Sequence, residues 1–327
     1  MLINMMTKMN RWLGERMFVV VLSALLLGFF VPVRNTPEIL SHLAVVLFAY
    51  MSFISALGTS FKDFYQILTR PWVPLWIFTQ IHIVVPAIAW VIGWVLYPTN
   101  YLTRLGLLIA ACIPVGVTSI IWTSLTEGSV ALAIVVVTLD TLLVPIVLPL
   151  TLYIIAGHSV ELDYSQMVFQ LLNMVTIPTI LGMVVNEFTK AKLKHFVEST
   201  GGFTSKVALF LVIFFNSIMI ASDINWDYGI IKLLLVVFLL VAFGYLLGFL
   251  ASRIISKQEE NGISQAMIYT IGMRNITFGS LLALAYFPST VAIPITLAML
   301  FQQPLAGAVS QICKKWLVGK DLRERVN

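Results

Sequence analysis

Charged residues are scarce in this sequence: Asp, Glu, Lys and Arg make up 11% of its 327 residues. A soluble domain carries about 25%, so the composition excludes a soluble globular enzyme, a disordered chain and a nucleic-acid binder. Cysteine is also rare, since Cys112 and Cys313 are the two in the whole chain. Two cysteines are too few for a disulfide framework or a zinc site.

Catalytic and nucleotide-binding motifs are missing as well. The sequence has no His-Glu-x-x-His, no Gly-x-Ser-x-Gly and no Gly-x-x-x-x-Gly-Lys. These motifs carry metalloprotease, serine-hydrolase and nucleotide chemistry. We therefore expect no enzyme activity, no cofactor and no bound metal, and any transport must draw its energy from ion or substrate gradients.

Apolar residues, in contrast, make up 59% of the chain. A membrane-spanning helix needs about 20 residues, so ten such helices with short connectors use about this whole length. Charges, Gly/Pro clusters and polar runs divide the chain accordingly. The predicted spans of this all-α integral membrane protein are 17–35, 39–57, 73–97, 104–126, 129–156, 165–187, 204–222, 230–252, 263–286 and 289–312.

Positive charges gather on one side of the membrane in this topology. If the N-terminus is cytoplasmic, the outer side holds Arg34, Arg104 and Lys232, and Arg274 falls inside a span. All other positive residues lie on the inner side. The positive-inside rule predicts a multi-pass protein of the cell membrane, with a short cytoplasmic N-terminus, 1–16, and a cytoplasmic C-terminal tail, 314–327.

The ten spans divide into two sets of five. The second set then enters the membrane from the opposite face, as in many secondary transporters. Weak internal similarity agrees, because Leu27-Gly28 matches Leu181-Gly182 and residues 129–134 resemble 290–295. We predict a single membrane transporter domain, 1–327, with inverted repeats over about 17–156 and 165–312.

Spans 104–126 and 263–286 occupy corresponding places and are both interrupted. The first carries Pro114 and Gly116, and the second carries Gly272. Pro removes an N–H and Gly loosens a helix, and backbone groups freed in this way are tolerated at membrane depth only inside protein or beside a cavity. Paired interruptions favour a binding site near the midplane over simple packing kinks.

Two charges lie near that midplane. Asp140 and Arg274 are each about 16 Å from the inner end of their span, and Thr118 is about 13 Å deep. An unpaired charge at the centre of a helix costs about 2.5–3.5 kcal/mol, so we expect a mutual ion pair or a water-filled cavity. The pair is either a salt bridge that locks two spans, or an anion-binding Arg274 with a proton-carrying Asp140.

Other polar residues are weaker candidates. Gln80, Thr123 and Thr141 can offer oxygen ligands, although Thr in a membrane helix usually bonds its own backbone. His82 is more typical of a core histidine than of a ligand. A channel or a receptor would need a continuous polar stripe or a sensory domain, and the sequence has neither.

The residues from Pro114 to Ala133 and from Thr141 to Pro145 closely resemble the signature of the bile acid:sodium symporter family. That signature is roughly Pro-Gly-Gly-x-x-Ser-Asn-x-x-Thr, then Gly-Asn-x-Ala-Leu-Ser and Ser-Thr-Leu-Leu-Ala-Pro. Gly272-Met-Arg274-Asn275 is similar to the family's Glu-x-Gly-x-Gln-Asn, and Lys62-Asp63-Phe64 also fits. The resemblance implies a panel domain (spans one, two, six and seven), a core domain of the other spans, and crossing broken helices four and nine at the substrate site.

The chain departs from this family where the relatives bind sodium. Ser119 is kept, but the family's other ligands are replaced by Ile120, Ala133, Val137, Thr270 and Arg274. A hard cation needs several oxygen ligands, which Ile, Ala and Val side chains cannot supply. Arg274 would place a permanent positive charge about where a sodium ion sits in the relatives.

The resemblance therefore implies a secondary transporter that moves a small organic anion by alternating access without sodium. A proton carried by Asp140 is the alternative coupling ion. The expected partners are the anionic substrate, the lipid bilayer and a proton, with no nucleic acid. The candidate binding residues are Gln80, Thr118, Ser119, Thr123, Asp140, Thr141, Thr270, Arg274 and Asn275.

The arsenite effluxers of the same superfamily are the alternative. Their pattern Pro-Cys-Thr-x-x-x-x-x-Trp shares Pro114 and Trp122, but the arsenite-binding cysteine falls on Val115 here. Cys112 lies three residues earlier, on the same side of a helix, and is the candidate metalloid ligand. A small apolar residue at this position is more typical of packing.

Overall fold

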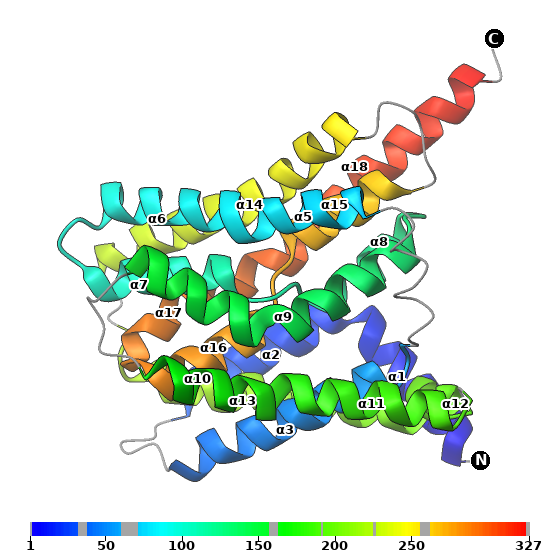
Figure 1. Cartoon of the computed structure of the whole chain (residues 1–327), viewed down its shortest axis with the longest axis horizontal. Coiled ribbons are helices and arrows are strands. Elements are labelled where there is room, and N and C mark those ends of the chain that lie inside the picture. Colours follow the sequence, from blue (N-terminus) through cyan, green and yellow to red (C-terminus); the bar gives the residue numbers. More distant parts are fainter. Residues whose placement is uncertain are drawn as a thin grey trace.

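The computed structural model describes residues 2–31, 38–59, 71–156, 163–190, 192–224, 227–255 and 262–324, and these are mostly helical (Figure 1). The family motif Lys62-Asp63-Phe64 and Arg34 lie outside the described residues. The α-helices are α1 (Leu2–Glu15), α2 (Met17–Phe30), α3 (Glu38–Ala56), α5 (Trp72–Thr79), α6 (Val85–Leu96), α7 (Tyr101–Cys112), α8 (Thr118–Leu125), α9 (Val130–Ala156), α10 (Tyr164–Leu171), α11 (Ile177–Phe188), α12 (Lys194–Phe196), α13 (Gly202–Ala221), α14 (Tyr228–Ile255), α15 (Ile263–Gly272), α16 (Ile276–Tyr286), α17 (Ala292–Leu297) and α18 (Met299–Glu324). Short π-helical turns, η1 (Gln80–Val84), η3 (Leu172–Thr176) and η4 (Val197–Gly201), and a 3-10 turn, η5 (Ser289–Val291), join some of them.

Seven helical stretches of the described chain are long and apolar enough to cross a membrane. Each overlaps one of the predicted spans. The prediction of an all-helical integral membrane protein is therefore confirmed. The seven stretches are Ile39–Ala56, Trp72–Leu96, Val130–Ile155, Tyr164–Phe188, Val197–Ala221, Tyr228–Ile255 and Ser289–Cys313.

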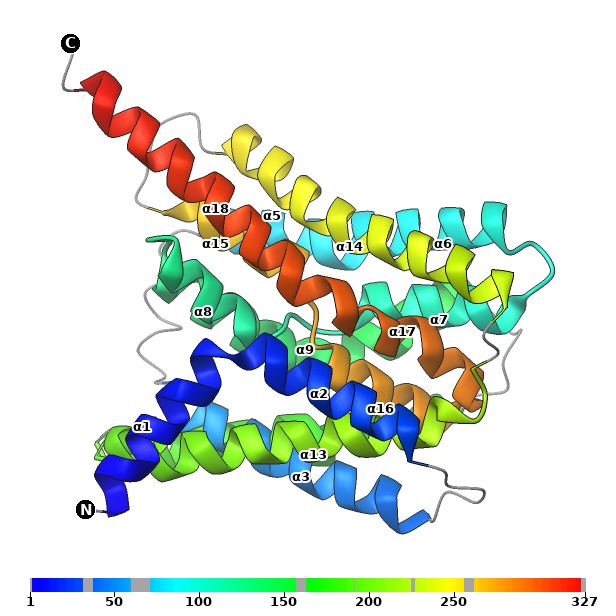
Figure 2. The ribbon, with the colours of Figure 1, turned by 180° about the vertical axis from the view of Figure 1, so that it is seen from behind.

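The helices form two outer layers with a third set between them (Figures 1 and 2). In one layer α13 packs on α2 and α3, and α3 packs on α11. In the opposite layer α14 packs on α15 and α18. The interrupted helices α7, α8 and α16, together with α9 and α17, lie between these layers, so their polar groups are enclosed by helices on both sides.

Two glycines set the spacing in the first layer. A Cβ on Gly28 of α2 would lie 2.5 Å from Ser217 Cβ of α13, and one on Gly182 of α11 would lie 2.5 Å from the Phe53 carbonyl oxygen of α3. Small residues allow such close helix approach, which gives van der Waals contact in place of the hydrophobic effect inside a bilayer. This layer is held by tight apolar packing.

Both ends of the described chain, the start of α1 and the end of α18, lie at the same end of the molecule (Figures 1 and 2). The predicted short N-terminus, 1–16, largely forms the helix α1, which bends by 77° from α2 and packs on η4 and α13. At the other terminus α18 continues as a helix through most of 314–327.

Candidate functional site

The two interrupted helices cross at their breaks. α7 ends at Cys112 and α8 begins at Thr118, whereas α15 ends at Gly272 and α16 begins at Ile276. The extended residues between them pair as an antiparallel bridge of Val115 with Arg274. We call residues 113–117 and 273–275 the crossing.

Backbone hydrogen bonds hold the crossing together. Gly116 N–H donates to the Met273 carbonyl at 3.1 Å, and Asn275 N–H donates to the Pro114 carbonyl at 2.7 Å. A Cβ on Gly116 would lie 2.9 Å from the Arg274 carbonyl oxygen, so only glycine permits this approach. The Asn275 side chain caps α16 by accepting from Phe278 N–H at 3.2 Å.

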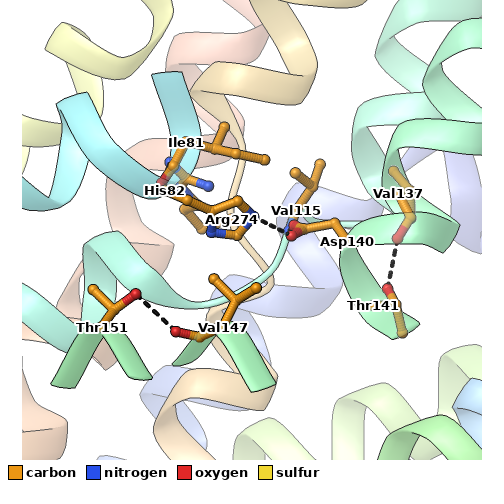
Figure 3. Close-up of polar contacts among 9 residues, drawn as sticks. All are labelled: Ile81, His82, Val115, Val137, Asp140, Thr141, Val147, Thr151 and Arg274. Atoms are coloured by element: carbon orange, nitrogen blue, oxygen red, sulfur yellow. Dashed lines mark hydrogen bonds and ion pairs between the residues drawn. The ribbon is translucent and has the colours of Figure 1, made fainter. Parts of the chain in front are cut away.

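Asp140 of α9 lies against the crossing with its side chain fully buried. Its Oδ2 accepts from Val115 N–H at 2.6 Å, and its Oδ1 lies 2.7 Å from His82 Nε2 (Figure 3). No hydrogen bond is found for either of these last two atoms within the described part of the chain. The contact between the carboxyl and the imidazole is an ion pair when His82 is protonated.

Arg274 lies beside them with 8% of its surface exposed. Its Nη2 donates to the Ile81 carbonyl at 3.3 Å, while Nη1 has no hydrogen-bond partner among the residues that the structure describes. Asp140 attracts the guanidinium electrostatically, but the direct ion pair of Asp140 with Arg274 is absent from the described residues. His82 takes the place that the sequence suggested for Arg274.

The free carbonyl of Ile81 follows from the sequence. In the π turn η1, Val85 N–H donates to the Gln80 carbonyl, five residues back. The next donor in this register would be Pro86, which has no N–H. The Ile81 carbonyl is therefore left open for the guanidinium of Arg274.

The sequence predicts His82 to be a core histidine, and the structure places it next to the carboxylate of Asp140. It stacks on Phe78, with ring centroids 5.7 Å apart, and faces Asp140. The signal available in the sequence was Pro86, since π turns in helices are frequent at functional sites and Pro86 lies one turn after His82.

The remaining candidates fall into three groups. Thr141 and Thr270 donate to the carbonyls of their own helices, 2.7 Å away in both cases, so their hydroxyl protons are taken. Ser119 and Thr123 are fully buried on α8, and in the described part of the chain their hydroxyl oxygens have no hydrogen-bond partner. Gln80 is buried in η1.

Thr118 belongs to a cavity of about 420 Å³ between the outer layers. The cavity begins near Asn10 of α1 and Glu198 of η4, which is exposed, and reaches Arg274 and Asn275 of the crossing. Its volume lies in the range of small-molecule sites, about 300–1,000 Å³. The sequence reading missed Gln302, Gln303 and Lys206, which also line it, because glutamine gives no pattern and Lys206 counted as a topology signal.

Cys112 is not among the residues that line this cavity. It is a free cysteine, 2% exposed, inside the apolar core. The arrangement gives no support to a metalloid ligand at this position.

A many-helix membrane protein with buried charges at two crossing helix breaks, beside a cavity of small-molecule size, has the construction of a solute transporter. A model of the Sodium Bile acid symporter family matches residues 43–226, and the chain belongs to this family of transporters.

Relatives from a bacterium and a frog match most of the chain. A Bacillus subtilis protein named "Uncharacterized protein YbaS" is 35% identical over 80% of this chain and 85% of its own length. The "Uncharacterized sodium-dependent transporter YocS" of the same bacterium is 25% identical over 89% of this chain and 88% of its own. "Sodium/bile acid cotransporter 7-B" of Xenopus laevis is 24% identical over 79% and 74%.

Proposed function

We propose that this protein is a secondary transporter that moves a small organic anion by alternating access, with the Arg274 guanidinium in the place of a sodium ion. The observation that carries the proposal is the position of Arg274. A permanent cation is built into the crossing, its guanidinium held by the Ile81 carbonyl at 3.3 Å. A site that already contains a cation has no need to bind one from solution.

The proposed sodium independence also rests on the neighbouring side chains. Ala133 and Val137 are buried apolar residues in α9, at positions where the resemblance suggests hydroxyl ligands. Thr270 donates its hydroxyl proton within α15, and its oxygen lone pairs remain the possible ligand at this position. Na⁺, like other hard cations, needs several oxygen ligands, and Ala133 and Val137 remove two of those that the resemblance suggests.

The proposed fold has ten spans in two inverted halves. The seven long stretches, α2, and the interrupted pairs α7/α8 and α15/α16 together give ten. The tight glycine contacts support the repeat: Gly28 of the first span packs on the seventh, and Gly182 of the sixth packs on the second. Equivalent spans thus use equivalent contacts. The layer of α2, α3, α10–α11 and α13 would be the panel domain, and the other spans the core.

We infer a cytoplasmic location for both termini, in the cell membrane. α1, which carries Lys8 and Arg11, lies at the same end of the molecule as α12 and the end of α18 (Figure 1), which agrees with the positive-inside rule. The cavity begins at this end, so the conformation would be one that opens toward the cytoplasm.

Asp140 and His82 are the proposed proton carriers. The carboxyl and imidazole atoms lie 2.7 Å apart and have no hydrogen-bond partner among the described residues, and Arg274 beside them would respond to any change in their charge. Protonation of Asp140 would release Arg274 to attract the substrate, which couples the two events.

The test is uptake into proteoliposomes. Organic anions that raise the unfolding temperature of the purified protein are first selected in a library screen, once in sodium and once in potassium buffer. Uptake of a selected anion is then driven by an imposed sodium gradient or by an imposed proton gradient. We expect uptake with no sodium gradient; uptake that follows the sodium gradient alone would overturn the proposal.

A further inference from the structure

One face of α1 is apolar and exposed. Met5, Met9 and Trp12 are spaced four and three residues apart, so they project from the same side of the helix. Each leaves at least 39% of its surface uncovered by the rest of the described chain. A row of large exposed apolar side chains marks a surface that contacts a membrane or another protein.

The opposite face of α1 is packed against the protein. Asn10 Nδ2 donates to the Glu198 carbonyl of η4 at 2.8 Å, and a Cβ on Gly14 would lie 3.5 Å from the Lys206 side chain of α13. η4 and the start of α13 form one end of the membrane-spanning stretch Val197–Ala221. These contacts place α1 at the membrane border and fix which face it turns away from the protein.

α1 runs across the membrane-spanning direction. It bends by 77° from α2, and Figure 2 shows it turned out of line with α2 at one end of the molecule. Because α2 is one of the proposed spans, a helix at this angle to it lies along the membrane surface. An amphipathic helix in that orientation inserts its apolar side chains among the acyl chains and keeps its polar side at the headgroups.

Positive charge borders the apolar face. Lys8 and Arg11 are exposed on α1, and Arg16 is exposed directly after it. The Arg16 guanidinium lies over the Trp12 ring, 4.7 Å from its centroid. Glu15 is the acidic residue of this segment, so three positive side chains stand against one negative side chain. An apolar face with a net positive border matches anionic phospholipids.

A groove of about 320 Å³ runs beside this face. Its lining is Lys8, Met9, Trp12 and Leu13 of α1, together with Phe203 of α13. A phospholipid has the same two parts, an apolar chain and a charged head. An acyl chain can lie along the four apolar side chains while a phosphate oxygen accepts a charge-assisted hydrogen bond from Lys8.

We propose that α1 is an interfacial helix that binds anionic phospholipids of the cytoplasmic leaflet, with Lys8 and Arg11 at the phosphates and Met9 and Trp12 among the acyl chains. The bound lipid would hold α1, and with it Asn10, at the mouth of the cavity. Lipid binding by α1 does not depend on which solute the protein carries, and the choice of leaflet rests on the proposed topology.

The test is thermal unfolding of the purified full-length protein in a neutral detergent with added dioleoylphosphatidylglycerol or dioleoylphosphatidylcholine. We expect the anionic lipid to raise the unfolding temperature of the wild type more than the zwitterionic lipid does, because a ligand that binds the folded state stabilises it. Lys8→Gln combined with Arg11→Gln should raise the anionic lipid concentration for half-maximal stabilisation about 25-fold, since each charge contributes about fivefold. Lys8→Arg combined with Arg11→Lys should retain the effect.

The control is Lys190→Gln combined with Lys192→Gln, which removes two exposed charges from the segment between α11 and α12. This pair should leave the effect of the anionic lipid unchanged. An equal weakening in both pairs would mean that net charge attracts the lipid, and it would overturn the inference. Equal stabilisation of the wild type by the two lipids would overturn it as well.

Trp12→Gln tests the apolar part of the contact. All charges are kept, yet the concentration of anionic lipid for half-maximal stabilisation should rise about tenfold, because a large apolar side chain no longer leaves water. An unchanged concentration would place the lipid elsewhere on the molecule and overturn the inference.

The wild type at about 0.5 M salt gives a measurement that needs no variant. Screening of exposed charges should remove most of the difference between the two lipids, and a difference that survives would contradict recognition by Lys8 and Arg11.

A second copy of this chain is the other possible occupant of the face. Light scattering in detergent distinguishes it from lipid. A monomer agrees with the lipid, whereas a dimer that becomes a monomer in Trp12→Gln would overturn the assignment.

Discussion

The two breaks at the crossing share a backbone geometry but differ in what satisfies it. At the first break, Val115 N–H donates to the carboxylate of Asp140. At the second, Arg274 N–H donates to the amide Gln302 Oε1 at 2.8 Å, and Gln302 Nε2 returns a bond to the Arg274 carbonyl at 3.0 Å. Asp140 lies on α9 and Gln302 on α18, which are equivalent spans in the proposed repeat.

This difference separates structure from function. Gln302 satisfies two backbone groups and adds no charge, so a neutral amide is sufficient to hold a broken helix at this depth. Asp140 satisfies only one backbone group and adds a buried negative charge, which needs Arg274 and His82 nearby. The charge of Asp140 is therefore more than the backbone requires, which supports the proposed role of this residue in proton coupling.

The largest effect is expected from Arg274→Ala. It removes the proposed internal cation and leaves Asp140 without its counter-charge, so uptake should fall about 100-fold or more. Expression and membrane insertion should persist, with a lower unfolding temperature. Proteoliposome uptake and thermal unfolding measure the two effects.

A double variant and a matched control complete that experiment. Asp140→Asn combined with Arg274→Ala should recover the unfolding temperature but not the uptake, because the buried charge is gone. Arg104→Ala, at an arginine outside the cavity, should leave uptake unchanged. Wild-type kinetics in Arg274→Ala would remove this residue from the site.

Asp140→Asn tests the comparison directly by making the first break resemble the second. The new amide can still accept from Val115 N–H, so the free energy of unfolding should change by about 1 kcal/mol. Uptake driven by an imposed proton gradient should be lost. Continued proton-driven uptake would mean that the carboxyl has only a structural role.

The sequence could predict the helical membrane fold, because apolar runs, Pro114, Gly116 and Gly272 act locally on the chain. It also placed Asp140 and Arg274 at a similar depth from helix geometry alone. The sequence could not predict which side chains contact Asp140 and Arg274. The contacts of His82 with Asp140, and of Gln302 with the second break, depend on which helices become neighbours.

Lys206 and α1 illustrate the same limit. A lysine near the end of a span satisfies the positive-inside rule wherever it points, so its place in the cavity is set by tertiary packing. The segment 1–16 carries Lys8, Arg11 and Arg16, which predict a cytoplasmic side but not the packing of α1 on η4 and α13.

Gln302→Leu removes the amide that satisfies the backbone at the second break. It leaves the N–H of Arg274 buried without a partner, while the Arg274 carbonyl still accepts from Ile276 N–H at 3.0 Å. We expect a loss of about 1–3 kcal/mol in unfolding free energy, measured in detergent. Gln303→Leu is the matched neighbour, since Gln303 contacts Trp122 and Thr118 side chains and no backbone group of the crossing. Equal losses in both variants would contradict the role of Gln302.

His82→Gln should give the smallest effect, because a glutamine can still donate to Asp140 but cannot take up a proton. We expect a change of about 1 kcal/mol in unfolding free energy and continued uptake at a lower rate. The pH profile of uptake should lose one titrating group.

His82→Phe keeps a ring that can stack on Phe78 but leaves Asp140 Oδ1 unpaired, so the free energy of unfolding should fall by about 1–3 kcal/mol. An unchanged pH profile in His82→Gln would leave Asp140 as the sole proton carrier. Together the two variants separate the proton uptake of His82 from its packing on Phe78. For Asp140 the two breaks make the same separation, because one is satisfied by a neutral amide and the other by a carboxylate.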